Sequence, residues 1–110
     1  MARVNLTVKS RDKLKEDGFK VLQTVETYNA FTKRKHDLFG IFDVLAVGGG
    51  RTIAIQVTSR DNMSSRRKKI LESPAFGECV QAGWDVELHG WWKEKNRWQV
   101  KLEVLSERDD

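Results

Sequence analysis

The chain has 110 residues and a mass of 12.7 kDa, which is enough for one folded domain with a single hydrophobic core. Its formal net charge of +4 favours an acidic partner such as nucleic acid. No apolar run approaches the roughly 20 residues that span a bilayer, and the first residues lack the apolar stretch of a signal peptide. We therefore expect one cytoplasmic domain that does not contact a membrane.

A helix and a strand are predicted at the start of the chain. Residues 5–17 contain good helix formers and end before Gly18, a residue type that commonly follows a helix. Residues 19–25, FKVLQTV, alternate in hydrophobicity and are rich in strand formers, so they predict the first strand.

A cationic segment follows this strand. Residues 26–36 show no steady hydrophobic period, so we expect an exposed loop. Near its end lie three consecutive cations, which either contact phosphate groups or form a solvated charge run: Lys33, Arg34 and Lys35.

A central β-hairpin is predicted next. The runs 41–47 and 52–58 are rich in Val, Ile, Leu and Phe, and they flank three glycines and Arg51. This is the pattern of a strand, a tight turn and a second strand. In the second run apolar residues alternate with polar ones, so one face of that strand is expected to be apolar.

The predicted register brings three polar side chains onto the other face. A loop over residues 48–51 places Asp43 directly opposite Gln56, two residues before Thr58. A shift by one residue would move Asp43 to the opposite face, so the cluster depends on the turn. One alternative is that Asp43 and Gln56 form only a hydrogen-bonded cross-strand pair on a solvated face.

The segment after the hairpin predicts a basic helix. Asn62 or Ser64 is a suitable cap, and Met63, Ile70 and Leu71 give a narrow apolar seam. Cations on such a helix contact phosphates without reading sequence, unless they only form a solvated face. The segment carries five of them: Arg60, Arg66, Arg67, Lys68 and Lys69.

A second helix and two strands complete the chain. Ser73 and Pro74 restart a helix that ends at Gly83, and its lone cysteine, Cys79, is expected to be a small buried hydrophobe without a disulfide or zinc role. Alternating apolar residues predict a strand before Gly90 and another after a polar turn. Four tryptophans of this region either pack between the strands and a helix or stack on unpaired bases: Trp84, Trp91, Trp92 and Trp98.

The predicted fold class is α/β. A single domain over residues 1–105 would contain a small mixed sheet with a central hairpin flanked by helices, followed by a disordered tail over residues 106–110.

Asp43 and Gln56 form a candidate metal site. A carboxylate and an amide oxygen are hard ligands of the kind that hold Mg²⁺ or Mn²⁺ against a phosphate, whereas Thr58 offers only a hydroxyl. Glu26 or Asp37 could add a second carboxylate. A cation could come from a neighbouring element, from Lys35, Arg60, Lys68 or Lys69.

The order helix, strand and hairpin, with an acid in the second strand, resembles the PD-(D/E)XK nuclease superfamily over about residues 5–92. GIFDVLAV resembles the segment that holds the metal-binding aspartate of that family, and AIQVTS resembles its acid-x-lysine segment. The chain is most similar to small phage-type or Holliday-junction-resolvase-like members. The resemblance implies that Asp43 binds the metal, that Gln56 takes the place of the second acid, and that Thr58 takes the place of the lysine.

We therefore expect a nuclease-like DNA-processing protein that hydrolyses phosphodiesters with Mg²⁺ or Mn²⁺ at Asp43 and Gln56, aided by Glu26 and Thr58. Its substrate would be duplex, branched or single-stranded DNA. The resemblance also implies a homodimer, because two sites are needed to cut two strands. Two alternatives stay open: a non-catalytic nucleic-acid-binding module that keeps the nuclease fold, and a structural or protein-interaction domain.

Overall fold

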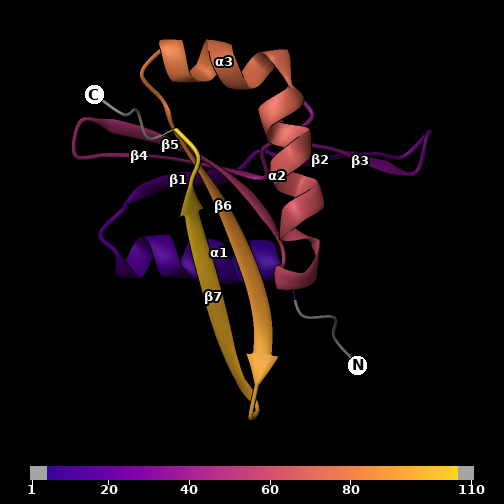
Figure 1. Ribbon diagram of the computed structural model, residues 1–110, viewed down its shortest axis with the longest axis vertical. Helices are drawn as coiled ribbons and strands as arrows, with labels where there is room; N and C mark the ends of the chain where they lie inside the picture. The colour runs from indigo at the N-terminus through magenta and orange to yellow at the C-terminus, as the bar shows by residue number, and fades with distance from the viewer. Residues whose placement is uncertain (1–4, 107–110) are drawn as a thin grey trace.

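Strands from both halves of the chain meet in one mixed sheet, with helices on both of its faces (Figure 1). The computed structural model describes residues 5–106, so all but the first residue of the predicted tail lies outside the described residues. The helical segments are α1 (Leu6–Glu16), the 3-10 turn η1 (Arg60–Asn62), α2 (Met63–Glu72) and α3 (Pro74–Gln81). The strands are β1 (Val21–Thr24), β2 (Thr27–Asn29), β3 (Arg34–His36), β4 (Val44–Gly48), β5 (Arg51–Ser59), β6 (Asp85–Glu94) and β7 (Arg97–Val104). The predicted α/β class and the mixed sheet with a central hairpin are confirmed.

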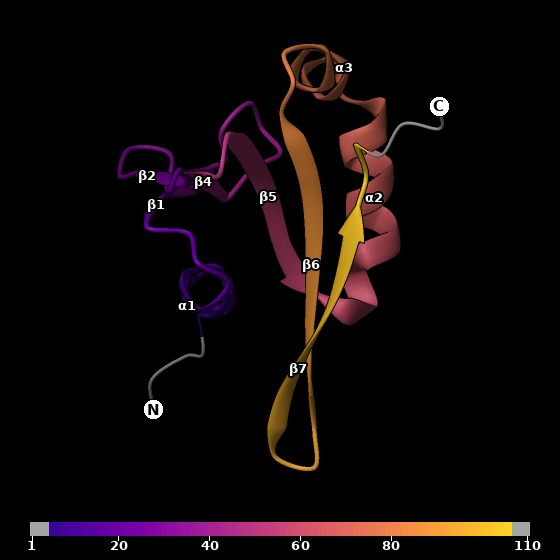
Figure 2. The ribbon, with the colours of Figure 1, turned by 90° about the vertical axis from the view of Figure 1, so that its left-hand side faces the viewer.

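The large sheet has the strand order β1-β4-β5-β6-β7. Strands β1, β4 and β5 form an antiparallel meander, whereas β5 and β6 are parallel. The crossover that this parallel pair requires is made by η1, α2 and α3. Strands β6 and β7 form a long antiparallel hairpin whose tip extends past α1 and α2 in both views (Figures 1 and 2).

The central hairpin has the predicted register. Val47 pairs with Thr52, and the ladder continues to Gly48 and Arg51, so the loop is the two residues Gly49 and Gly50 and not four. These glycines have φ of +59° and +77°, the left-handed values that a tight hairpin turn needs. The shorter loop leaves the register of the strands unchanged, so Asp43 lies on the predicted face.

The prediction of a loop over residues 26–36 is wrong, because β2 and β3 form a two-stranded sheet there, on either side of a turn. A local turn produces this hairpin: the side-chain oxygen of Asn29 accepts hydrogen bonds from the backbone N–H groups of Phe31 (2.9 Å) and Thr32 (3.3 Å). Lys33 completes the turn with φ of +54°. All residues of both strands are exposed, which is why the segment has no hydrophobic period.

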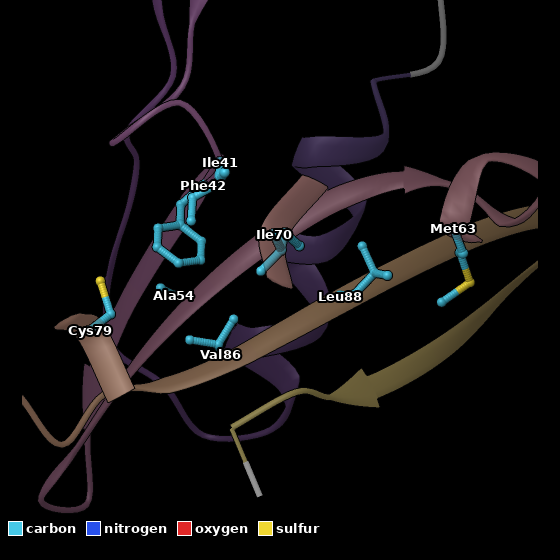
Figure 3. Close-up of a cluster of buried hydrophobic side chains, with 8 residues drawn as sticks. All are labelled: Ile41, Phe42, Ala54, Met63, Ile70, Cys79, Val86 and Leu88. Carbon is cyan, nitrogen blue, oxygen red and sulfur yellow. The ribbon is translucent and has the colours of Figure 1, made fainter. Parts of the chain in front are cut away.

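The core consists of two layers, one on each face of the sheet. On one face, Leu14 of α1 belongs to a buried cluster with Val44 and Ile55. On the other face, α2 and α3 cover a cluster that extends from β5 to β6 (Figure 3). Its buried members are Ile41, Phe42, Ala54, Met63, Ile70, Cys79, Val86 and Leu88. Both faces of β5 are therefore covered by helices.

Gly90 allows the start of α2 to approach the sheet closely. A Cβ atom at this position would lie 2.1 Å from Sδ of Met63, which is too close for any side chain. The strand predicted to lie before Gly90 in fact continues through it as β6, because the glycine is a packing site and not a turn. The turn comes at Lys95 and Asn96, both with positive φ.

Two predictions about single side chains can also be compared with the structure. Cys79 is buried as predicted, and burial raises the pKa of its thiol. Trp91 is buried beside α1, where its indole N–H donates to Oγ of Ser10 (2.8 Å), and the other tryptophans are half-buried.

Among residues 5–106, no helix has the length and apolar character that a membrane span requires.

Candidate functional site

Three carboxylates converge where β1 ends and β4 begins. Glu26 follows β1, Asp37 follows β3, and Asp43 precedes β4, and one oxygen of each lies within 4.8 Å of the others. Two features bring them together. The backbone N–H of Val25 donates to the carbonyl of Asp43 (2.8 Å), and the β2–β3 hairpin returns the chain to the same place before Asp37.

Asp43 is the buried member of this acidic cluster, with 4% of its surface exposed. Its Oδ2 accepts a hydrogen bond from Nε2 of Gln56 and another from the backbone N–H of Val57, both at 2.8 Å. The predicted contact between Asp43 and Gln56 is thus confirmed. The hydrogen-bonded cross-strand pair of the alternative is present, but the prediction that it lies on a solvated face is wrong, because Gln56 is only 3% exposed.

Burial raises the pKa of the Asp43 carboxyl from 3.8 to about 7. The backbone hydrogen bond from Val57 opposes this rise, while a hydrogen bond with Asp37 and the negative charges of Asp37 and Glu26 add to it. Ionising all three carboxylates at this separation is energetically unfavourable unless a cation compensates their charge.

The amide oxygen of Gln56 provides a second, independent feature of the site. Its Oε1 is buried, and no donor within residues 5–106 lies within hydrogen-bonding distance of it. A buried carbonyl oxygen without a partner is costly, and it is a ligand type that Mg²⁺ and Mn²⁺ accept. The oxygen donors of this site therefore fit a small divalent cation.

Cations surround the mouth of the cleft that contains the acidic cluster. Nζ of Lys35 lies 3.0 Å from Oε1 of Glu26, and Arg66 and Lys69 of α2 line the same cleft. The cleft has a volume of about 700 Å³ and is lined mainly by polar atoms. Negative charge at the base and positive charge around the mouth suit a cation below a phosphate group.

Not every predicted site residue reaches this cleft. Thr58 is 7% exposed and pairs with Gly90, the glycine over which Met63 packs, so it lies beneath the start of α2 and does not line the cleft. Arg60 stacks over the ring of Trp92 instead.

Four other predicted cations also lie away from the cleft. Arg67 makes a two-fold hydrogen-bonded ion pair with Glu103 of β7, which lowers the pKa of that glutamate. Lys68 is exposed on α2, and Lys33 and Arg34 are exposed on the β2–β3 hairpin. None of the four lines the cleft.

The sequence did not predict some of the residues that form this site. The N–H of Val57 holds Asp43, and Asn5 and Thr7 at the start of α1 line one wall of the cleft. Asn5 carried a visible signal as a helix cap, since its side chain accepts from the N–H of Thr7 (3.0 Å). No sequence signal indicated that this end of the helix faces the hairpin.

A second polar cluster lies on the α1 side of the sheet. Oγ of Ser10 is 2.9 Å from Nδ1 of His89, whose Nε2 is 3.0 Å from the carboxylate of Glu87. This order of groups resembles a nucleophile, base and acid. Ser10 is 0% and His89 1% exposed, however, so neither can touch a substrate, and the cluster links α1 to β6 structurally.

Comparison with known proteins found no match: no protein-family model, curated protein or solved structure matches this chain.

Proposed function

We propose that the protein is a nuclease-like DNA-processing protein that hydrolyses phosphodiester bonds with Mg²⁺ or Mn²⁺ in the cleft above Asp43. The observation that carries this proposal is the acidic cluster beside the unpartnered oxygen of Gln56, at the base of a cleft with cations around its mouth. The element order from which the resemblance to PD-(D/E)XK nucleases was drawn also supports it.

In this proposal the carboxylates of Glu26, Asp37 and Asp43, together with Oε1 of Gln56, hold the ion. When bound, the ion would neutralise phosphate charge and polarise the bond to be broken. Ionisation of Asp43 would then be favoured, because a cation reverses the electrostatic penalty that raises the pKa of its carboxyl.

The cations have a separate role. Lys69 and Arg66 approach from α2 and are placed to contact phosphate oxygens, as charge-assisted donors do. Lys35 is paired with Glu26 and is 72% exposed, so its flexible side chain can reach a phosphate in the cleft. It supplies the positive charge that Thr58 cannot.

Cleavage assays test this function. Purified protein is incubated with single-stranded, duplex and branched DNA, with Mn²⁺, Mg²⁺ or EDTA. We expect cleavage of at least one substrate with metal, and its loss in Asp43→Asn, which keeps the size of the side chain. The matched control is Asp85→Asn, which removes a carboxylate paired with Arg51 on the surface and should leave cleavage intact.

A non-catalytic nucleic-acid-binding module is the second candidate. It is favoured by the uncharged Thr58 at the place of the lysine, buried beneath α2. Salt-sensitive DNA binding without cleavage under any metal condition would support this module over the nuclease. Absence of binding at low salt would exclude both functions. A homodimer remains part of the nuclease proposal, and light scattering with and without DNA measures it.

A further inference from the structure

We propose that the cleft between η1 and the β6–β7 hairpin is a stacking site for an unpaired nucleobase of the DNA strand whose phosphate occupies the acidic site. This inference rests on the function proposed above and adds its substrate class: DNA with unpaired nucleotides next to the bond that is cut. The cleft, called here the stacking cleft, is lined by Ser59, Arg60, Trp92, Lys93 and Trp98, among others.

The stacking cleft lies next to the acidic site. Leu6, the first residue of α1, lines both clefts. Strand β5 also runs from one to the other, since Gln56 and Val57 line the acidic site and Ser59 lines the stacking cleft. A strand rises about 3.3 Å per residue, so three residues separate the two by roughly 10 Å. Neighbouring nucleotides of one strand can therefore occupy both.

Four of the side chains that line the stacking cleft are of kinds that bind bases without reading sequence. Two half-buried indoles, Trp92 and Trp98, line it together with the cations Arg60 and Lys93. The guanidinium of Arg60 lies 4.4 Å from the centroid of the Trp92 ring, and nucleobases stack on both indole rings and guanidinium planes. The volume of about 410 Å³ is in the range of small-ligand sites.

Paired DNA cannot use such a site, because its bases are already stacked within the duplex. The β6–β7 hairpin, which contributes Trp92, Lys93 and Trp98 to the cleft, projects from the rest of the fold (Figures 1 and 2), so a flexible strand can bend around it as it leaves the acidic site. Trp84, by contrast, lies against Phe39 in an apolar groove beside α3 and has no cation over its ring in the described part of the chain.

The test uses the full chain in EDTA, so that binding is measured without metal or cleavage. Fluorescence anisotropy would give the affinity for three labelled probes: an oligothymidine strand, a strand of equal length with abasic residues, and a duplex. We expect the oligothymidine to bind more tightly than the abasic strand. Trp92→Ala or Trp98→Ala should weaken oligothymidine binding roughly tenfold and leave abasic-strand binding unchanged.

Two variants serve as controls. Trp92→Phe keeps an aromatic face and should retain most of the affinity for oligothymidine, while Trp84→Phe should behave like the wild type. Circular dichroism checks that each variant is folded. Equal binding of the thymidine and abasic strands by the wild type would overturn the stacking cleft, as would an equal loss for both probes in Trp92→Ala.

The outcomes for the two proposals are distinguishable. Base-dependent binding without cleavage by any metal would remove the nuclease function and keep the stacking cleft. Metal-dependent cleavage with base-independent binding would remove the stacking cleft and keep the nuclease.

Discussion

Gln56 donates its side-chain amide to Oδ2 of Asp43 at 2.8 Å, and this bond determines which way the amide faces. The amide nitrogen faces Asp43, so Oε1 is left without a hydrogen-bond partner within residues 5–106. The pair thus combines a carboxyl group with a buried carbonyl oxygen that has no hydrogen-bond partner in the described part of the chain.

Replacing this amide should change metal affinity in a predictable order. Gln56→Glu adds a carboxylate beside Asp43, so we expect Mn²⁺ to bind about tenfold more tightly, because ligand charge sets the affinity of such sites. Gln56→Met has no oxygen and should bind Mn²⁺ more weakly than the wild type. Melting temperatures measured with Mn²⁺ and with EDTA report the difference.

The same melting experiment can also exclude contact between Gln56 and the ion. Without metal, Gln56→Glu should melt below the wild type, because like charges would be buried together. If Mn²⁺ raised the melting temperature of all three proteins equally, Gln56 would not contact the ion.

The raised pKa of Asp43 predicts how stability depends on pH. The folded protein holds a proton on Asp43 up to about pH 7, whereas the unfolded chain releases it near pH 3.8. The contribution of this group to the free energy of unfolding should therefore be greatest at low pH and fall as pH rises to about 7, by on the order of 4 kcal/mol. Urea titrations in EDTA across this range measure the fall.

Asp43→Asn has no titrating carboxyl at this position, so its free energy of unfolding should lack this pH dependence. The stability of the variant relative to the wild type should therefore increase with pH. Asp85→Asn should keep the dependence of the wild type. Adding Mn²⁺ should flatten the wild-type curve, because a bound cation favours the ionised carboxylate. Parallel curves for the wild type and Asp43→Asn would show that Asp43 keeps an ordinary pKa.

Adjacent arginines on α2 should differ in their effect on DNA binding. Arg66 and Lys69 line the acidic cleft, whereas Arg67 is engaged by Glu103. The logarithm of the affinity for duplex DNA falls linearly with the logarithm of the salt concentration, and we expect Arg66→Gln and Lys69→Gln each to make this slope less steep by about 0.9. Arg67→Gln should leave this slope unchanged and reduce stability. A smaller slope in Arg67→Gln would place the DNA on the other side of α2.

Two glycines should respond oppositely to alanine. At Gly90 the new methyl group would overlap Met63, which is 4% exposed and has little room to move, so Gly90→Ala should destabilise the fold by about 1–3 kcal/mol. Gly77 lies inside α3 with nothing within 4 Å of the new atom, so Gly77→Ala should stabilise it by up to about 1 kcal/mol. Chemical denaturation compares the two, and equal effects would contradict the close approach of α2.

The parts of the fold predicted from sequence are those that depend on local signals. The glycine turn determines the register of β4 and β5, and that register alone was enough to bring Asp43 to Gln56. Ser73 and Pro74 marked the start of α3 for the same reason, since the side chain of Ser73 accepts a hydrogen bond from the N–H of Ala75 in its own helix.

The rest depends on contacts between distant segments. Asp37 and Glu26 were candidates, but their meeting depends on β2 and β3, whose exposed residues carry no periodic signal. The burial of Thr58 depends on how closely α2 approaches β6, which Gly90 permits and no local pattern reveals. Tertiary packing therefore decided which of the predicted polar residues face the cleft.

The parallel pairing of β5 with β6 has a consequence for the order of folding. Every proposed ligand of the acidic site lies within residues 26–57, where β2 pairs with β3 and β4 pairs with β5 across short turns. The cations of α2 are positioned only after β6 has closed a loop of some two dozen residues against β5, and long closures are slower. Pulse-labelling hydrogen exchange should therefore show protection in β4 before β6, so that the acidic base of the cleft forms before its cationic mouth.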